Sequence, residues 1–152
     1  MRRASAAVLL ALLPAAQAVQ PQQPAPAFEA LAQQRGKVVL VDFWASWCGP
    51  CRQAMPHYQA LRREFAAQGF EVIGIDVDQD PRDGAAALKS LHPDYPQVAD
   101  PQGRIAAQYQ LPGMPTAYLL DRRGTVRRVQ VGFDQNDIEP LHRAVAQLVE
   151  ER

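Results

Sequence analysis

The sequence predicts two buried strands joined by one helix. This pattern limits the possible folds of the chain more than any other feature. Residues 38–44 are apolar except for Asp42 and begin with β-branched residues, which is typical of a strand covered on both faces. Residues 50–68 carry apolar side chains at helical spacing, and residues 71–77 form a second strand-like run that is apolar except for Glu71 and Asp76. Strand, helix and strand in this order form a right-handed crossover between parallel strands. The sequence therefore predicts an α/β fold.

The rest of the chain predicts further helices and one antiparallel hairpin. The hairpin joins residues 116–120 to residues 125–131. The last helix is predicted to start at Asn136, with Glu139 completing a capping box. Shorter helices are predicted at 28–34, 85–91 and 103–109. Together these elements predict a central mixed β-sheet flanked by helices.

Length and charge favour one compact domain. The chain has 152 residues, of which 47% are hydrophobic, so it can bury a core. Its 16 Lys plus Arg balance 16 Asp plus Glu. A net charge of zero gives no long-range attraction for phosphate, so we expect no nucleic-acid partner.

The N-terminus has the pattern of a secretory signal peptide. A basic start is followed by a short apolar run and by small residues that end at Ala18. We therefore predict a signal peptide over residues 1–18, a Pro- and Gln-rich linker over 19–27 and one domain over 28–152. This organisation predicts a soluble periplasmic protein, or a membrane-anchored one if the signal is not cleaved.

Cys48 and Cys51 are the only cysteines, and they form a C-x-x-C pair where the first predicted strand meets the helix. The free amides and the positive dipole end of the helix favour a thiolate at Cys48. Cys51, one turn further, is expected to be shielded and to attack a mixed disulfide formed at Cys48. Pro50 suits the first helical turn, and Gly49 lets the backbone pass closely. The pair is therefore suited to opening and closing a disulfide.

Two alternatives for the cysteine pair are a static disulfide and a metal site. A bridge across two intervening residues removes little entropy from the unfolded chain, so it stabilises poorly. His57, His92 and His142 have no spacing that converges on the cysteines. We therefore predict thiol chemistry, with no metal and no cofactor.

The stretch from Val41 to Cys51, VDFWASWCGPC, resembles the active-site segment of the thioredoxin superfamily. Residues 95–124 are similar to the TlpA/ResA-like branch of secreted thioredoxins. The resemblance covers residues 28–152 and implies a thioredoxin fold with an extra helical insertion between the second and third core strands, for which residues 78–100 are long enough. It also implies thiol–disulfide exchange, with electrons supplied by a membrane donor of the DsbD/CcdA type.

Further site residues follow from the resemblance. Asp42 matches the buried acid of thioredoxins; burial should raise its pKa, and it would accept the Cys51 proton. Pro115 matches the family's cis-proline, which leaves the preceding backbone free to pair with an extended substrate. Trp47 would form a flat wall beside Cys48. The predicted substrate-binding residues are Trp47, Gly49, Pro50, Met114 and Pro115.

The chain also departs from the family pattern. Residues 28–36 are short and helical in character, so the N-terminal β-hairpin of many TlpA-like chains is expected to be missing. That branch often has asparagine at the position of Asp42. Gly74 stands where thioredoxin has a lysine, so Asp42 would lack a partner cation, which should raise its pKa further.

These features predict an exported thiol-disulfide oxidoreductase in which Cys48 attacks a disulfide of a protein substrate and Cys51 resolves the intermediate. The Gly-Pro dipeptide is that of thioredoxin, whose potential is about −270 mV, so we expect a reductant. We also expect a monomer. The resemblance suggests a role in cytochrome c or copper-site assembly. The alternatives are a disulfide oxidase or isomerase, and a copper or haem chaperone that uses the thiols as ligands.

Overall fold

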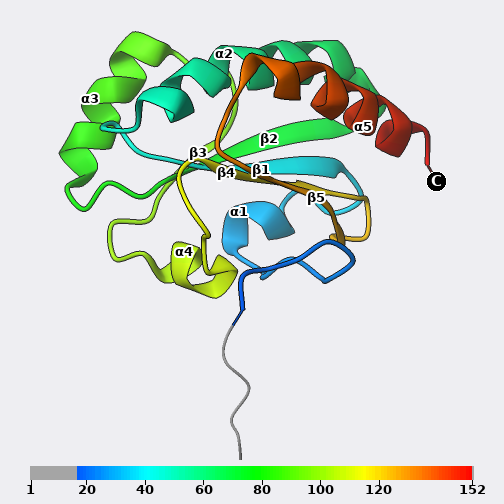
Figure 1. The fold of residues 1–152 in the computed structure, drawn as a ribbon, viewed down its shortest axis with the longest axis horizontal. Helices are drawn as coiled ribbons and strands as arrows, with labels where there is room; N and C mark the ends of the chain where they lie inside the picture. The colour runs from blue at the N-terminus through cyan, green and yellow to red at the C-terminus, as the bar shows by residue number, and fades with distance from the viewer. Residues whose placement is uncertain (1–16, 152) are drawn as a thin grey trace, which may run out of the picture.

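The computed structural model describes residues 17–151, which form a five-stranded sheet between two layers of helices (Figure 1). The order across the sheet is β3-β2-β1-β4-β5. Neighbours β1, β2 and β3 run parallel, whereas β4 is antiparallel to both β1 and β5. The strands are β1 (Val38–Trp44), β2 (Phe70–Asp76), β3 (Gln97–Ala99), β4 (Thr116–Leu120) and β5 (Val126–Val131). The predicted central mixed sheet is therefore confirmed.

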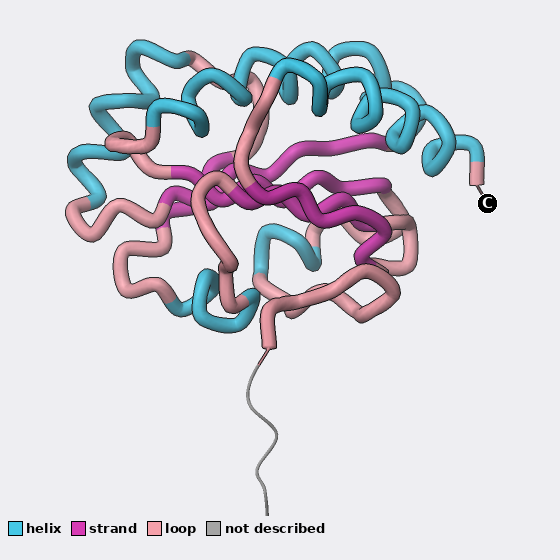
Figure 2. Tube along the Cα trace, in the orientation of Figure 1, coloured by secondary structure: helices cyan, strands magenta, loops and turns pink. Residues whose placement is uncertain are grey.

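Helices cover both faces of the sheet. They are α1 (Glu29–Ala32), α2 (Gly49–Phe65), α3 (Pro81–Leu91), α4 (Arg104–Tyr109) and α5 (Ile138–Glu150), with 3₁₀ turns over Ala66–Gln68 and Gln135–Asp137. α2, α3 and α5 pack on one face, and α1 and α4 pack on the other (Figure 2). Because α3 lies between β2 and β3, the predicted helical insertion is confirmed. The topology is that of the thioredoxin fold.

β1 is the central strand and is buried on both faces. Leu40 and Trp44 lie in the core under α2 and α5, whereas Val41 and Phe43 lie in the core under α1 and α4. Burial on both faces explains why the run is apolar throughout. Successive side chains of a strand alternate between faces, so the one acid, Asp42, projects to the α2 side.

The structure differs from the sequence-based prediction at β3 and at the start of α5. β3 is a three-residue strand where the sequence pattern predicts none, because so short a strand shows no alternation. The cap before α5 is Asp134, whose side chain accepts the N–H of Asn136, while Asp137 accepts the N–H of Asp134. The predicted capping box of Asn136 with Glu139 is wrong, because Asn136 lies inside a 3₁₀ turn that precedes the helix.

The Pro- and Gln-rich segment over 19–27, which the sequence predicts as a linker, is docked on the domain. The Gln22 N–H donates to the carbonyl of Val126 at 2.7 Å, and the Val126 N–H donates to the carbonyl of Gln23 at 2.8 Å. The Val19 side chain is buried in the core under α1 and α4. Since β5 is an edge strand, its unpaired backbone groups provide a partner that composition does not reveal.

The predicted signal peptide, residues 1–18, lies outside the described residues except for its last two. Among the helices of residues 17–151, none is both long and apolar enough to cross a membrane. The expected export therefore stays a prediction.

Candidate active site

The Cys48–Cys51 pair lies where β1 ends and α2 begins, as predicted, and the two sulfurs are joined in a disulfide. Cys48 is the N-cap of α2, and its Sγ accepts the N–H of Cys51 at 3.3 Å. Cys48 is 5% exposed and Cys51 is fully buried. Gly49 and Pro50 are exposed at the start of the helix. A substrate therefore reaches the Cys48 sulfur before the Cys51 sulfur.

The N-cap position determines the chemistry of the Cys48 sulfur. The first N–H groups of a helix have no acceptor within the helix, and they stabilise a negative charge placed beside them. The Cys51 N–H is directed at this sulfur, and a hydrogen bond to a charged acceptor is stronger than one to a neutral acceptor. The first turn of α2, which the structure describes in full, contains no acidic residue. The site therefore favours a Cys48 thiolate after reduction.

Asp78 holds the loop that leads to Cys48, and it was not among the predicted site residues. Its Oδ2 accepts the Ser46 N–H at 2.7 Å, and its Oδ1 accepts the Ser46 hydroxyl at 2.8 Å. The Asp78 N–H donates in turn to Asp76 Oδ1 at 2.9 Å, and burial raises the pKa of Asp76 to about 6. Parallel strands β1 and β2 end at the same edge of the sheet, so the two acids at and just after the end of β2 were a signal that sequence reasoning missed.

Replacing Asp78 with alanine will loosen the loop that carries the cysteine pair. The change removes both acceptors of Ser46 and leaves its N–H unpaired, so we expect the free energy of unfolding to fall by about 2–3 kcal/mol. The Ser46 amide should also exchange its hydrogen faster. Ser46→Ala is the matched control, because it removes only the hydroxyl bond and should cost about 1 kcal/mol. Equal costs for the two variants, with unchanged exchange, would contradict this role.

Asp42 lies in β1 with Gly74 of β2 and Ala117 of β4 as its neighbours in the sheet. Its carboxylate oxygens have no hydrogen-bond partner among the residues that the structure describes. Removal from water raises the pKa of Asp42 to about 8, in the direction that the sequence predicts. A lysine at position 74 could not be placed without rearrangement, because its Cβ would overlap the Gln97 side chain. Gln97 is itself fixed by the Trp44 indole N–H, which donates to Oε1 at 2.9 Å.

The Met114–Pro115 segment lies at the same edge of the sheet as the cysteines. The peptide bond between the two residues is cis, as the resemblance implies. The next residue, Thr116, pairs with Phe43 near the end of β1. Pairing between β1 and β4 therefore brings Pro115 to the end of β1 from which the chain continues to Cys48.

Two large apolar side chains are exposed in the described part of the chain, and both belong to this edge. Trp47 is 67% exposed immediately before Cys48. Val131 is 54% exposed at the end of β5, and it pairs with Thr116 next to the cis-proline. Exposed apolar side chains around a reactive group are typical of a surface that contacts another protein. Trp47 was predicted for such contact, and Val131 was not.

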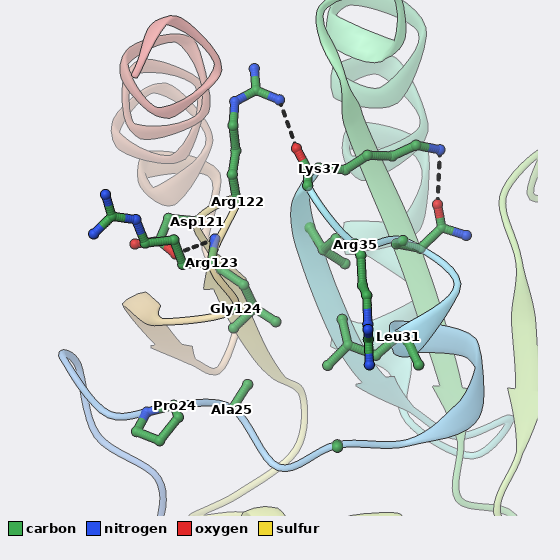
Figure 3. Close-up of a pocket in the computed structure, with 15 residues that line it drawn as sticks. Pro24, Ala25, Leu31, Arg35, Lys37, Asp121, Arg122, Arg123 and Gly124 are labelled. Carbon is green, nitrogen blue, oxygen red and sulfur yellow. Dashed lines mark hydrogen bonds between the residues drawn. The ribbon is translucent and has the colours of Figure 1, made fainter. Parts of the chain in front are cut away.

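A cavity of about 410 Å³ lies at the opposite end of the sheet, where β1 begins and β4 ends (Figure 3). Leu31 and Arg35 line one side, and Arg123 and Gly124 line the other. None of the predicted site residues lines it. Within residues 17–151, no group of three or more His, Cys, Asp and Glu side chains is placed to hold a metal ion.

The mixed sheet, the buried acid, the cis-proline and the disulfide at the start of α2 define a class: a thioredoxin-fold domain with a C-x-x-C active-site motif. The chain belongs to the AhpC/TSA family, whose family model matches residues 21–129. This match and the relatives described next confirm membership of the thioredoxin superfamily and resemblance to its ResA-like branch.

Two curated relatives carry names that describe thiol chemistry or the fold. The chain is 30% identical over 110 residues to the thiol-disulfide oxidoreductase ResA of Geobacillus kaustophilus, and 33% identical over 105 residues to the thioredoxin-like protein YneN of Bacillus subtilis. These matches cover 72% and 67% of this chain. They cover 63% and 61% of the relatives, so the chain spans about three fifths of their length.

One solved structure is similar over nearly its whole length. It is a Chlorobium tepidum protein provisionally assigned as the thiol:disulfide interchange protein DsbE, with a TM-score of 0.83 and 33% sequence identity. The similarity covers 87% of this chain and 99% of that one. The thioredoxin fold with its extra helix is therefore confirmed by comparison as well as by topology.

Proposed function

We propose that this protein is a thiol-disulfide oxidoreductase that exchanges its Cys48–Cys51 disulfide with disulfides of protein substrates. The observation that carries this proposal is the placement of the two sulfurs. The outer one caps a helix and accepts an amide hydrogen bond, and the inner one is fully buried behind it. ResA and DsbE, to which this chain is similar, are named for the same activity.

The reduced protein would act in two steps. In the first, the Cys48 thiolate attacks a substrate disulfide, whose S–S bond breaks, and a mixed disulfide forms as one substrate thiolate leaves. In the second, the Asp42 carboxylate takes the Cys51 proton, and the Cys51 sulfur attacks Cys48. The second substrate thiolate then leaves, so that two electrons have passed from the dithiol to the substrate.

The direction that we propose is reduction outside the cytoplasm. The residues between the cysteines, Gly49 and Pro50, are those of thioredoxin. An oxidising compartment would leave the pair oxidised, so a membrane donor of the DsbD/CcdA type would keep it reduced. The ResA-like resemblance supports a role in cytochrome c or copper-site assembly, and we propose that the protein acts as a monomer.

Equilibration with thiol–disulfide redox buffers will give a reduction potential of about −270 mV, because the Gly-Pro dipeptide favours the disulfide form of the protein. The reduced protein should then reduce the disulfides of insulin, and the reduced fraction can be followed by alkylation and mass spectrometry. A potential above about −180 mV would contradict the reductant role and support an oxidase or isomerase. Copper binding at nanomolar free metal without insulin reduction would support a metal chaperone.

A further inference from the structure

Three buried side chains in the core around Cys51 carry oxygens without a protein partner. Asp42, Tyr58 and Tyr95 are 0%, 1% and 4% exposed. Their four side-chain oxygens have no hydrogen bond to any residue that the structure describes. A buried polar group without a hydrogen bond destabilises the fold, so each of these oxygens is expected to have a hydrogen-bond partner.

The three side chains share the core between the sheet and α2. Asp42 projects from β1 to the α2 side. Tyr58 lies two helical turns after Cys51 on the same face of α2, and Tyr95, between α3 and β3, packs into the same core. Burial raises the pKa of both tyrosines, and the negative charge of Asp42 is the second cause of the rise. The effect is consistent with the shared core, in which the two tyrosines pack on the face of the sheet to which Asp42 projects.

The tyrosines on the other face of the sheet show a different arrangement. Tyr109 and Tyr118 are fully buried, yet their hydroxyls have protein partners. The Tyr109 hydroxyl donates to the carbonyl of Pro26 at 3.0 Å, and the Tyr118 hydroxyl donates to the carbonyl of Tyr109 at 3.5 Å. Phenylalanine would fill the core beside Asp42 without an unpaired oxygen, so packing alone does not account for tyrosine there.

We propose that Tyr58 and Tyr95 are positioning residues whose hydroxyls donate hydrogen bonds, through a shared internal water, to the Asp42 carboxylate as it takes the Cys51 proton. A buried water makes about three hydrogen bonds to otherwise unpaired groups. The two hydroxyls and the carboxylate provide that number of partners. This role rests on the proposed function, because it concerns the step that resolves the mixed disulfide.

The proton and electron balance of that step is simple. The Cys51 S–H bond breaks, and an O–H bond forms on the Asp42 carboxylate. The electron pair left on the Cys51 sulfur forms the S–S bond with Cys48. The mixed disulfide between Cys48 and the substrate breaks, and the substrate thiolate leaves with the electron pair of that bond. Both tyrosines keep their protons throughout. Their hydrogen bonds stabilise the carboxylate before the transfer, so that Asp42 is available as a base at lower pH than it would be without them.

Few other charges face this cluster. The sheet neighbours of Asp42 are not ionisable. The charge of Asp137, at the start of α5, adds to the rise in the pKa of Tyr58, and the charge of Asp94 adds to that of Tyr95. Among the buried side chains of α2, Cys51 is the titratable group besides Tyr58.

Gln97 is the uncharged polar residue beside Tyr95. Its Oε1 accepts the Trp44 indole N–H at 2.9 Å, and its amide donates to the Tyr95 backbone carbonyl at 3.5 Å. The Gln97 amide lies near the Tyr95 hydroxyl and partly offsets the rise in the pKa of Tyr95, although the contact does not have the geometry of a hydrogen bond. The Tyr95 hydroxyl is therefore free to bond to the water.

The experiment is a carbon-13 NMR titration of the Asp42 carboxyl in the reduced protein, for the parent chain and for the variants Tyr58→Phe and Tyr95→Phe. Burial alone raises the pKa of Asp42 to about 8, and the hydrogen bonds of the proposal should hold the parent midpoint below that value. Each variant should raise the midpoint by about one pH unit, because the water that bonds to the charged carboxylate loses one of its two hydroxyl donors. The rate of mixed-disulfide resolution at pH 7 should fall about tenfold and recover as the pH is raised.

Tyr109→Phe is the matched control, since it removes a buried and paired hydroxyl on the other face of the sheet and should leave the midpoint unchanged. Midpoints that are unchanged or lowered in both Asp42-facing variants would overturn the proposal. A shift of equal size in the control would overturn it as well. The NMR titration needs no substrate, so it gives its answer even if the protein shows no disulfide exchange, and the two proposals can fail separately.

Discussion

Replacing Cys48 with serine will reduce insulin reduction to the uncatalysed rate, whereas replacing Cys51 with serine will trap substrates as mixed disulfides. The first variant loses the sulfur at the helix N-terminus, which is the group that substrate reaches first. The second keeps that sulfur but cannot complete the exchange, because the buried resolving thiol is gone. Non-reducing electrophoresis with mass spectrometry of the captured partner measures both outcomes.

The double variant with serine at both positions is the control, and it should form no covalent complex. Trapped complexes that survive in the Cys48→Ser variant would reverse the assigned roles. Full reductase activity in both single variants would contradict the mechanism. In cells, the protein that the Cys51→Ser variant captures identifies the substrate directly.

Replacing Asp42 with asparagine will stabilise the protein at neutral and alkaline pH and slow the resolving step. With its pKa raised to about 8, Asp42 is protonated in the folded protein at pH 7 but ionised in the unfolded chain. Unfolding therefore releases a proton between about pH 4 and pH 8, so the free energy of unfolding falls as pH rises through that window. At about 1.4 kcal/mol per pH unit, the loss relative to pH 4 reaches about 4 kcal/mol at pH 7.

Asparagine does not titrate, so the variant should lose this pH dependence. We expect similar stability for the two proteins near pH 4 and a difference of about 4 kcal/mol at pH 7, measured by urea unfolding of the oxidised forms. Asp83→Asn, at an exposed position in the first turn of α3, is the control and should keep the parent slope. Parallel pH profiles for the parent chain and Asp42→Asn would contradict the assignment of a buried neutral acid.

The sequence alone predicted those parts of the site that depend on the spacing of nearby apolar residues. A run that is apolar on both faces, followed by an amphipathic helix, is enough to place Cys48 and Cys51 at a strand–helix junction. The buried position of Asp42 followed from the same run. The cis bond before Pro115 came from resemblance, since composition alone favours trans.

Features that depend on contacts between distant segments could not be predicted in this way. The Asp78 bonds to Ser46 span 32 residues and exist because two parallel strands end together. The docking of the segment before α1 depends on the free edge of β5, which the sequence does not mark. The grouping of Tyr58 with Tyr95 was missed because helical spacing identifies Tyr58 as core but does not say which groups face its hydroxyl.

The proposed activity depends on Cys48 being the reactive thiol at a helix terminus and on Cys51 being covered beneath it. Brief alkylation of the reduced protein with iodoacetamide at pH 6, followed by mass mapping of the modified residue, tests this most directly. We expect Cys48 to be modified at least about tenfold faster than Cys51, because thiolates react and covered thiols do not. Equal rates, or faster modification of Cys51, would contradict it.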